Sequence, residues 1–193
     1  FFAFGAAGVL IADNIGPLVA SLTGFEIFAN VTFSFVLAST AVYLIVSRGI
    51  WNINPISTAI GSPPDLSGEW DGHLYTDTDD YDKKDVVAIN ELGYGLVKME
   101  ASMNITQSWD QIHVEFEGPN SSSTSTGATI LFDDQTPTLT YNYDNLGDDF
   151  NEELNQHDGT TTIEYDSESE TLEGTYYTGP NRENHGHIEL KRM

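Results

Sequence analysis

The sequence predicts an all-β domain, an eight-stranded antiparallel up-and-down barrel, preceded by a transmembrane hairpin of two helices. Three observations support this fold class. Short stretches of alternating apolar and polar residues recur from residue 68 onward. An uncharged stretch of 20 residues covers 27–46, and residues 171–192 have the pattern of a final β-hairpin. Together they predict a barrel that is tethered to a bilayer.

The chain of 193 residues divides by pattern into three parts. Residues 1–50 hold two apolar segments, at about 1–22 and 27–46, and residues 51–64 form a proline-containing linker. Residues 65–193 form the predicted barrel, which is long enough to bury a core of its own. Because the chain begins with Phe1 rather than Met, we expect a short N-terminal piece to precede it.

Acidic residues dominate the predicted barrel. The formal net charge is -23, from 30 acidic and 7 basic residues, and residues 1–60 contribute only Asp13, Glu26 and Arg48 to it. The remainder therefore carries 28 acidic and 6 basic residues, a net charge of -22. Self-repulsion of this size destabilises a compact domain, but about 1 M salt shortens the Debye length to about 3 Å. The even spread of charge predicts a solvated surface in a halophilic, haloarchaeal cytosol, with recruitment of a basic partner or of many cations as the alternative.

The second apolar segment has the length of a membrane span. About 20 apolar residues cross a bilayer core, and residues 27–46 match this length without a charge. Glu26 and Arg48 bracket the segment, and Tyr43 and Trp51 lie where interfacial aromatic side chains are expected. The connection to the first segment is so short that the two form a helical hairpin. Arg48 and the positive-inside rule then place the barrel in the cytoplasm, at the inner membrane.

The first apolar segment contains two polar residues, Asp13 and Asn14. A carboxylate at the middle of a bilayer costs about 3 kcal/mol on insertion scales. Asp13 should therefore contact protein or water, or be protonated. One interpretation is a polar contact that drives assembly of several chains. The other is a segment that is shorter or re-entrant, with both residues near an interface. Small residues on both segments are compatible with self-association.

Eight period-two stretches, separated by Gly, Asn, Asp and Pro, are predicted as strands. They cover residues 68–75, 95–106, 111–118, 122–132, 138–143, 160–165, 171–178 and 186–192. Alternation assigns to the inner face Trp70, Gly72, Leu74, Val97, Met99, Ala101, Met103, Ile105, Ile112, Val114, Phe116, Ala128, Ile130, Leu139, Tyr141, Tyr143, Thr161, Ile163, Tyr165, Leu172, Gly174, Tyr176, Thr178, Ile188 and Leu190. Closure removes exposed strand edges, and the interior of eight strands can hold one small ligand.

Several inner-face positions carry hydroxyl groups, where a pure packing core would have Leu or Val. Tyr141, Tyr143, Tyr176 and Thr178 are these candidates, together with the aromatic Trp70 on the same face. Buried hydroxyl groups need hydrogen-bond partners. The partner is either a ligand inside the barrel or water at its mouth.

Three further candidates lie outside the apolar alternation. Arg182, in the last hairpin, could reach a phosphate with its fork-shaped guanidinium, or pair with a surface carboxylate such as Glu183. His157 precedes a predicted strand and could bind a base or a phosphate, or structure its own loop. Ser125 belongs to the Ser/Thr run at 121–126, which could line a mouth or form a flexible strand entry.

The sequence predicts neither catalysis nor a metal site. The acidic run at 77–85 lacks the glycine that a calcium-binding loop needs at its sixth position. There is no His/Glu zinc spacing, glycine-rich phosphate loop or nucleophile elbow, and no cysteine that could supply a thiolate. We therefore expect a protein that is not an enzyme and that has no cofactor.

An ordered set of short motifs carries a resemblance to a known family. These are Leu-Ser-Gly-Glu-Trp-Asp-Gly at 66–72, whose Gly-x-Trp-x-Gly start also occurs in lipocalin-like barrels, Asn-Ile-Thr-Gln-Ser-Trp-Asp-Gln-Ile at 104–112, His-Asp-Gly-Thr at 157–160, and Leu-Glu-Gly-Thr-Tyr-Tyr-Thr at 172–178. With the two apolar segments before them, they resemble the CD-NTase-associated protein 15 family, the membrane β-barrel effectors of CBASS anti-phage defence. The resemblance spans nearly the whole chain.

The resemblance implies a sensor of a cyclic dinucleotide made by a CD-NTase cyclase, which is a functional partner without required direct contact. Ligand binding in the barrel would promote homo-oligomerisation and disruption of the inner membrane, causing abortive infection. The expected partners are then the cyclic dinucleotide, the lipid bilayer and further copies of the chain, with no nucleic acid polymer. Two alternatives remain open: a membrane-tethered lipocalin-like carrier of an apolar small molecule, and an exported surface protein glycosylated at Asn120.

Overall fold

The computed structural model describes residues 32–78, 86–90, 93–119, 121–132, 136–145, 157–179 and 184–193, and the chain divides into two compact units, Phe1–Ser62 and Pro63–Met193. The first predicted membrane segment, at 1–22, lies outside the described residues, as do residues 27–31 of the second. The predicted hairpin therefore stays a prediction.

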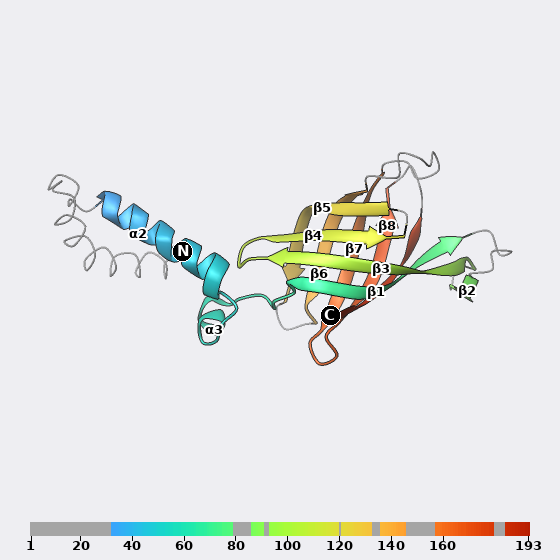
Figure 1. Ribbon diagram of the computed structural model, residues 1–193, viewed down its shortest axis with the longest axis horizontal. Helices are drawn as coiled ribbons and strands as arrows, with labels where there is room; N and C mark the ends of the chain where they lie inside the picture. The colour runs from blue at the N-terminus through green and yellow to red at the C-terminus, as the bar shows by residue number, and fades with distance from the viewer. Residues whose placement is uncertain are drawn as a thin grey trace. The chain divides into compact units, whose positions relative to one another are not determined.

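The described part of the first unit is helical. Helix α2 (Thr32–Ile45) continues into the π-helical turn η2 (Val46–Ile50), and a short helix α3 (Ile56–Ile60) follows (Figure 1). Pro55, which cannot donate a backbone hydrogen bond, precedes α3. Among the described residues, none of the helices combines the length and the apolar character that a bilayer crossing requires.

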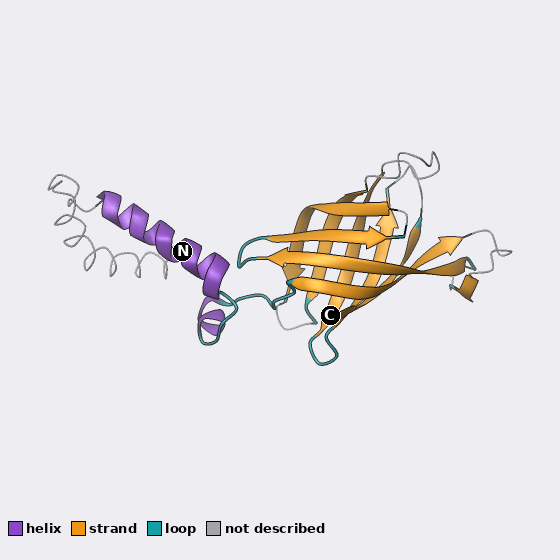
Figure 2. Cartoon of the chain, in the orientation of Figure 1, coloured by secondary structure: helices purple, strands orange, loops and turns teal. Residues whose placement is uncertain are grey.

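The second unit is a closed antiparallel barrel (Figure 2). Eight strands form its wall in the order β1, β9, β8, β7, β6, β5, β4, β3, and pairing of β1 with β3 closes the ring. The strands are β1 (Gly68–Thr78), β3 (Gly95–Gln107), β4 (Ile112–Gly118), β5 (Ser121–Leu131), β6 (Thr138–Asn145), β7 (His157–Asp166), β8 (Thr171–Thr178) and β9 (His185–Arg192). The predicted eight-stranded up-and-down barrel is confirmed.

One short strand was not predicted. Strand β2 (Val86–Ile89) pairs only with residues Gly95 to Val97 of β3, on the side of β3 that β4 leaves unpaired there. Its four residues are Val, Val, Ala and Ile, so they give no alternation that a period-two search could find. The strand exists because β3 is long enough to pair with two partners along one edge.

A β-bulge in β5 moves side chains between faces. The register of β5 against β6 shifts between Ser125 and Gly127. One extra residue at this point brings Ser123 and Ala128 onto the same inner face, although one has an odd and the other an even number. Strict alternation along the whole strand would have placed one of them outside.

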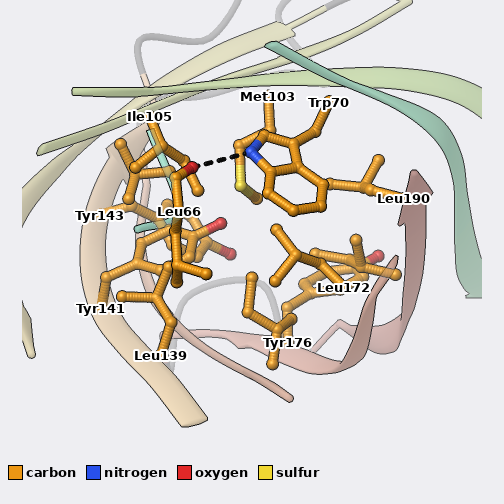
Figure 3. Packing of buried hydrophobic residues seen from close by; sticks show 13 residues of the cluster. Leu66, Trp70, Met103, Ile105, Leu139, Tyr141, Tyr143, Leu172, Tyr176 and Leu190 are labelled. Carbon is orange, nitrogen blue, oxygen red and sulfur yellow. Dashed lines mark hydrogen bonds between the residues drawn. The ribbon is translucent and has the colours of Figure 1, made fainter. Parts of the chain in front are cut away.

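The core is packed most fully at the end of the barrel nearest its N-terminal entry, and it continues toward the other end through Tyr141, Tyr143, Tyr176 and Ile188. All its fully buried apolar members were assigned to the inner face except Leu66, which lies before the first strand. The cluster is Leu66, Trp70, Met103, Ile105, Val114, Leu139, Tyr141, Tyr143, Ile163, Leu172, Tyr176, Ile188 and Leu190 (Figure 3). Leu66 could not be predicted because no strand pattern includes it.

The chain entering β1 closes this end of the barrel. The indole N–H of Trp70 donates to the carbonyl of Leu66 at 2.9 Å, as the dashed line in Figure 3 shows. Gln107 accepts the backbone N–H of Leu66 at 2.7 Å through its side-chain oxygen. The Arg192 guanidinium lies 4.3 Å from the centre of the Trp70 ring and donates to the carbonyls of Asp65 and Ser67. These contacts hold the entering segment across the closed end.

Removal of the Arg192 side chain should destabilise the barrel. Arg192→Ala deletes two hydrogen bonds from a charged donor and a cation–π contact, so we expect a loss of about 2–4 kcal/mol in the free energy of unfolding. Lys191→Ala, at an exposed position on the same strand, is the control and should change it by no more than about 0.5 kcal/mol. Urea unfolding followed by tryptophan fluorescence measures both, and equal effects would contradict this account of the closed end.

Candidate functional site

A cavity of about 320 Å³ occupies the other end of the barrel. The strand halves that surround it are those farthest from the entering segment: the end of β1, the start of β3, the end of β6 and β8, and the start of β7 and β9. Its lining residues are Leu74, Thr76, Asp77, Thr78, Val97, Met99, Phe116, Gly118, Pro119, Ser121, Ser123, Tyr141, Tyr143, Asn145, His157, Thr161, Tyr176, Thr178, Asn184 and Ile188. The barrel is therefore packed at one end and hollow at the other.

The lining has an apolar wall and a hydroxyl-bearing wall. Strands β1, β3, β4 and β9 contribute the apolar side chains Leu74, Val97, Met99, Phe116 and Ile188, and the end of β1 adds the polar residues Thr76, Asp77 and Thr78 at the rim. Strands β5 to β8 contribute the hydroxyl groups Ser121, Ser123, Tyr141, Tyr143, Thr161, Tyr176 and Thr178. Such a cavity can bind a ligand that has both an apolar face and several polar groups.

Two tyrosines of the second wall lie over glycines of the neighbouring strand. Tyr143 pairs with Gly159, and a Cβ atom at Gly159 would lie 2.3 Å from the Tyr143 hydroxyl oxygen. Tyr176 pairs with Gly186, where a Cβ atom would lie 2.7 Å from a ring carbon of Tyr176. Because neither glycine has a side chain, each ring can lean across the sheet. The sequence thus fixes the orientation of both rings.

Tyr141 lies deepest among the aromatic residues of this wall. It is 2% exposed, and its ring centre is 6.2 Å from that of Tyr143. Burial raises the pKa of Tyr141 to about 12, and a hydrogen bond with the Thr161 side chain partly opposes the shift. Burial disfavours the charged form of a phenol, so the deep part of the cavity is poorly solvated and disfavours negative charge.

The rim of the cavity is built from strand ends that hydrogen-bond to one another. The Thr178 hydroxyl donates to the carbonyl of Asn184 at 3.1 Å and accepts its backbone N–H at 2.8 Å. The Asn184 amide donates to the Thr76 hydroxyl at 3.2 Å, which joins the residue before β9 to β1. The ring of His157, at the start of β7, lies nearly perpendicular to that of Tyr143, with the ring centres 6.4 Å apart. The rim is thus polar and ordered by its own contacts.

The structure brings five of the predicted site residues together around this cavity: Tyr141, Tyr143, Tyr176, Thr178 and His157. It does not bring Trp70 and Ser125 there. Arg182 lies outside the described residues, so its predicted role stays a prediction. The ligand-binding roles of all these residues stay predictions.

Trp70 and Ser125 have other contacts. Trp70 faces inward as expected, but it is near the start of β1 and lies within the packed end, under Arg192. The Ser125 hydroxyl, beside the bulge, accepts the backbone N–H of Val114 at 2.9 Å and lies 3.3 Å from Nδ1 of His113. Face assignment from alternation gave neither the position along the barrel axis nor the bulge.

Several lining residues were missed because they lie beyond the predicted strand ends. Thr76 belongs to β1, which ends at Thr78, and Asn145 is the last residue of β6. Asn184 precedes β9. Extending the alternation from Leu74 to Thr76 and from Tyr143 to Asn145 would have identified the first two. No pattern signals Asn184.

Charge at the cavity is sparse within the described part of the lining. No Lys or Arg side chain is included, and Asp77 is the acidic member. Asp77 accepts the backbone N–H of His185 at 3.0 Å and lies 3.2 Å from Nδ1 of the same residue. The described lining therefore recognises a ligand mainly through neutral groups.

A separate cluster of titratable residues lies on the outer face of β8 and β9. Ligand atoms of Glu173, His187 and Glu189 are within 4.8 Å of one another, and Nε2 of His187 is 3.3 Å and 3.5 Å from the two carboxylates. Both glutamates are exposed. Ion pairing of the imidazole with two surface carboxylates accounts for this arrangement.

The raised pKa of Tyr141 predicts a loss of stability at high pH. The ordinary pKa is 10.0 and the folded value is about 12, so the folded state holds this proton more tightly. This stabilisation is fully present below pH 10.0 and is lost as the pH rises through about 12. We expect the free energy of unfolding to fall over this range by about 1–3 kcal/mol more in the wild type than in Tyr141→Phe.

Urea unfolding at several pH values between about 9 and about 12 measures this change in the free energy of unfolding for both proteins. Tyr177→Phe is the matched control. Tyr177 lies in β8 and is 57% exposed, so this variant should show the pH dependence of the wild type. The same pH dependence in Tyr141→Phe and wild type would contradict the burial argument.

Comparison with known proteins identifies the barrel unit. The Cap15 cyclic dinucleotide receptor domain matches residues 62–192. The chain is 27% identical over 133 residues to CD-NTase-associated protein 15 of Yersinia aleksiciae, an alignment that covers 67% of this chain and 56% of the relative. The chain thus spans little more than half the length of that relative. Since the matched region includes every strand of the barrel and the whole described lining of its cavity, the chain belongs to the Cap15 cyclic dinucleotide receptor domain family.

Proposed function

We propose that the chain is a membrane-anchored CBASS effector that senses a cyclic dinucleotide in its barrel. The observation that carries this proposal is the cavity at one end of the barrel, lined on one side by hydroxyl groups and aromatic rings. A barrel filled by side chains along its whole length would have had no place for a ligand. Membership of a receptor domain family gives the ligand class.

The chemistry of the cavity suits a cyclic dinucleotide. Such a ligand has two bases that stack on aromatic rings, two riboses with polar groups, and two phosphodiesters that accept hydrogen bonds. Tyr143 and Tyr176 offer rings, and His157, Asn145 and Asn184 offer hydrogen-bonding groups. These groups bind and orient, so we propose a receptor rather than an enzyme.

The membrane part of the proposal rests on the sequence. Residues 27–46 are uncharged and have the length of a bilayer span, and Arg48 follows them on the barrel side. We propose an inner-membrane anchor with the barrel in the cytoplasm, where a cyclase would make the ligand. Homo-oligomerisation and membrane disruption upon ligand binding complete the proposed activity.

The placement of the barrel can be tested in spheroplasts. A cytoplasmic barrel is shielded by the inner membrane, so added protease should degrade it only after the membrane is permeabilised. Cleavage in intact spheroplasts would contradict the proposed orientation. A periplasmic marker protein, degraded in both conditions, serves as the control.

Ligand sensing predicts a thermal shift. A cyclic dinucleotide that binds only the folded barrel should raise the melting temperature of the purified full chain, because saturation at about 100 times Kd adds about 2.7 kcal/mol of stability. Differential scanning fluorimetry in molar salt measures the shift across a panel of cyclic dinucleotides. The absence of a shift with every member of the panel, with the fold intact, would contradict the proposal.

The same assay tests Arg182. Arg182→Ala should reduce the shift because it removes a bidentate phosphate donor, and should leave the melting temperature of the unliganded chain near its original value. Lys191→Ala is the matched control, since Lys191 lies in β9 near the closed end of the barrel. An unchanged response in Arg182→Ala would remove Arg182 from the site.

A further inference from the structure

The cavity changes character between its depth and its rim. In the depth, Tyr141 is 2% and Thr161 is 1% exposed, and the facing wall is formed by apolar side chains such as Leu74 and Met99. At the rim, His157, Asn145 and Asn184 lie at strand ends. A ligand that has both uncharged and anionic parts therefore meets two different environments.

The depth suits a nucleobase better than a phosphate. Transferring an anion into a poorly solvated region is unfavourable unless a cation or several donors compensate it. The described side chains of the depth are neutral, and burial raises the pKa of Tyr141, which is the expected response of a site that disfavours negative charge. A base is uncharged, its flat faces are apolar and its edge forms hydrogen bonds, so both walls can be used at once.

The size of the cavity supports partial entry. A volume of about 320 Å³ is at the lower end of ligand sites, which run from about 300 to about 1,000 Å³. A cyclic dinucleotide contains two nucleosides held in one ring by two phosphodiesters. One nucleoside can enter, while the phosphates and the second nucleoside stay at the mouth.

We propose that one nucleobase of the ligand enters the barrel first and that the phosphates stay at the rim. This inference rests on the proposed sensing function and adds an orientation and a specificity determinant to it. The hydroxyl groups of Tyr141 and Thr161 read the edge of the inserted base, and His157 contacts a phosphate. Figure 3 shows the rings of Tyr141 and Tyr143 inside the barrel wall, where such a base would lie.

Base contacts and phosphate contacts have different consequences for selectivity. Every cyclic dinucleotide has the same phosphates, so loss of a phosphate contact weakens all of them by a common factor. The bases differ in their donors and acceptors, so loss of a base contact changes the ratio of affinities between ligands. The two kinds of contact can therefore be separated with a panel of ligands.

The test measures Kd by isothermal titration calorimetry with the full chain in molar salt. The probes are the 3′,5′-linked cyclic dinucleotides that carry two guanines, two adenines or two uracils. Tyr141→Phe should change the affinity ratio of at least two of them by about tenfold, the effect of one lost base contact. His157→Gln should weaken all of them by the same factor, within about twofold.

Two further variants keep the test decisive. Thr161→Val removes the second deep hydroxyl group at nearly constant volume, so it gives the same readout if Tyr141→Phe is unstable. Tyr177→Phe, an outward-facing tyrosine that is 57% exposed, is the control and should leave every Kd unchanged.

The opposite pattern would overturn the orientation. If the deep variants weaken all ligands equally, or if His157→Gln changes the ratios, a phosphate occupies the depth and a base the rim. A wild-type chain that binds no member of the panel is a different result, which refutes the sensing function itself.

Discussion

Closure of the barrel through β1 is the constraint on which the rest of the structure depends. Strand β1 hydrogen-bonds to β3 along its whole length and to β9 from Trp70 to Thr76. Because both edges of β1 are paired, the inner face of every wall strand is turned toward one shared interior. Packing at one end of that interior and a cavity at the other follow from which side chains the strands place there.

The two ends of the barrel interior differ in packing. At the closed end, Leu66, Trp70 and Arg192 join the entering segment to the last strand, and large apolar side chains fill the space. At the open end, tyrosines lean over glycines and leave room. Most of the buried core therefore lies at the closed end, although Tyr141, Tyr143 and Tyr176 belong both to the core and to the cavity lining. Substitutions in the hydroxyl wall leave the packing around Leu66 and Trp70 in place.

The acidic exterior and the neutral interior are complementary. With a net charge of -22 on residues 61–193, the outer surface repels an anionic ligand in dilute buffer and much less in molar salt, where the Debye length is about 3 Å. Hydroxyl groups, amides and aromatic rings bind through short-range contacts that screening hardly weakens. A cavity that binds through such groups retains its affinity at salt concentrations that weaken a cationic phosphate site.

The sequence by itself determined the barrel, its eight wall strands, their order and nearly all of the core, because the alternation of apolar residues has the period of a strand and each strand pairs with its sequence neighbour. It also identified Tyr141, Tyr143, Tyr176, Thr178 and His157 as inward or rim positions. Only the tertiary structure decided where along the barrel each inward residue lies. Alternation shows which face of the sheet a side chain lies on, but it gives no position along the barrel axis. It therefore could not separate Trp70 in the packed end from Tyr143 in the cavity. The bulge at Ser125 and the burial of Leu66 likewise depend on pairing and closure with other segments. Strand β2 is short and uniformly apolar, so alternation could not identify it.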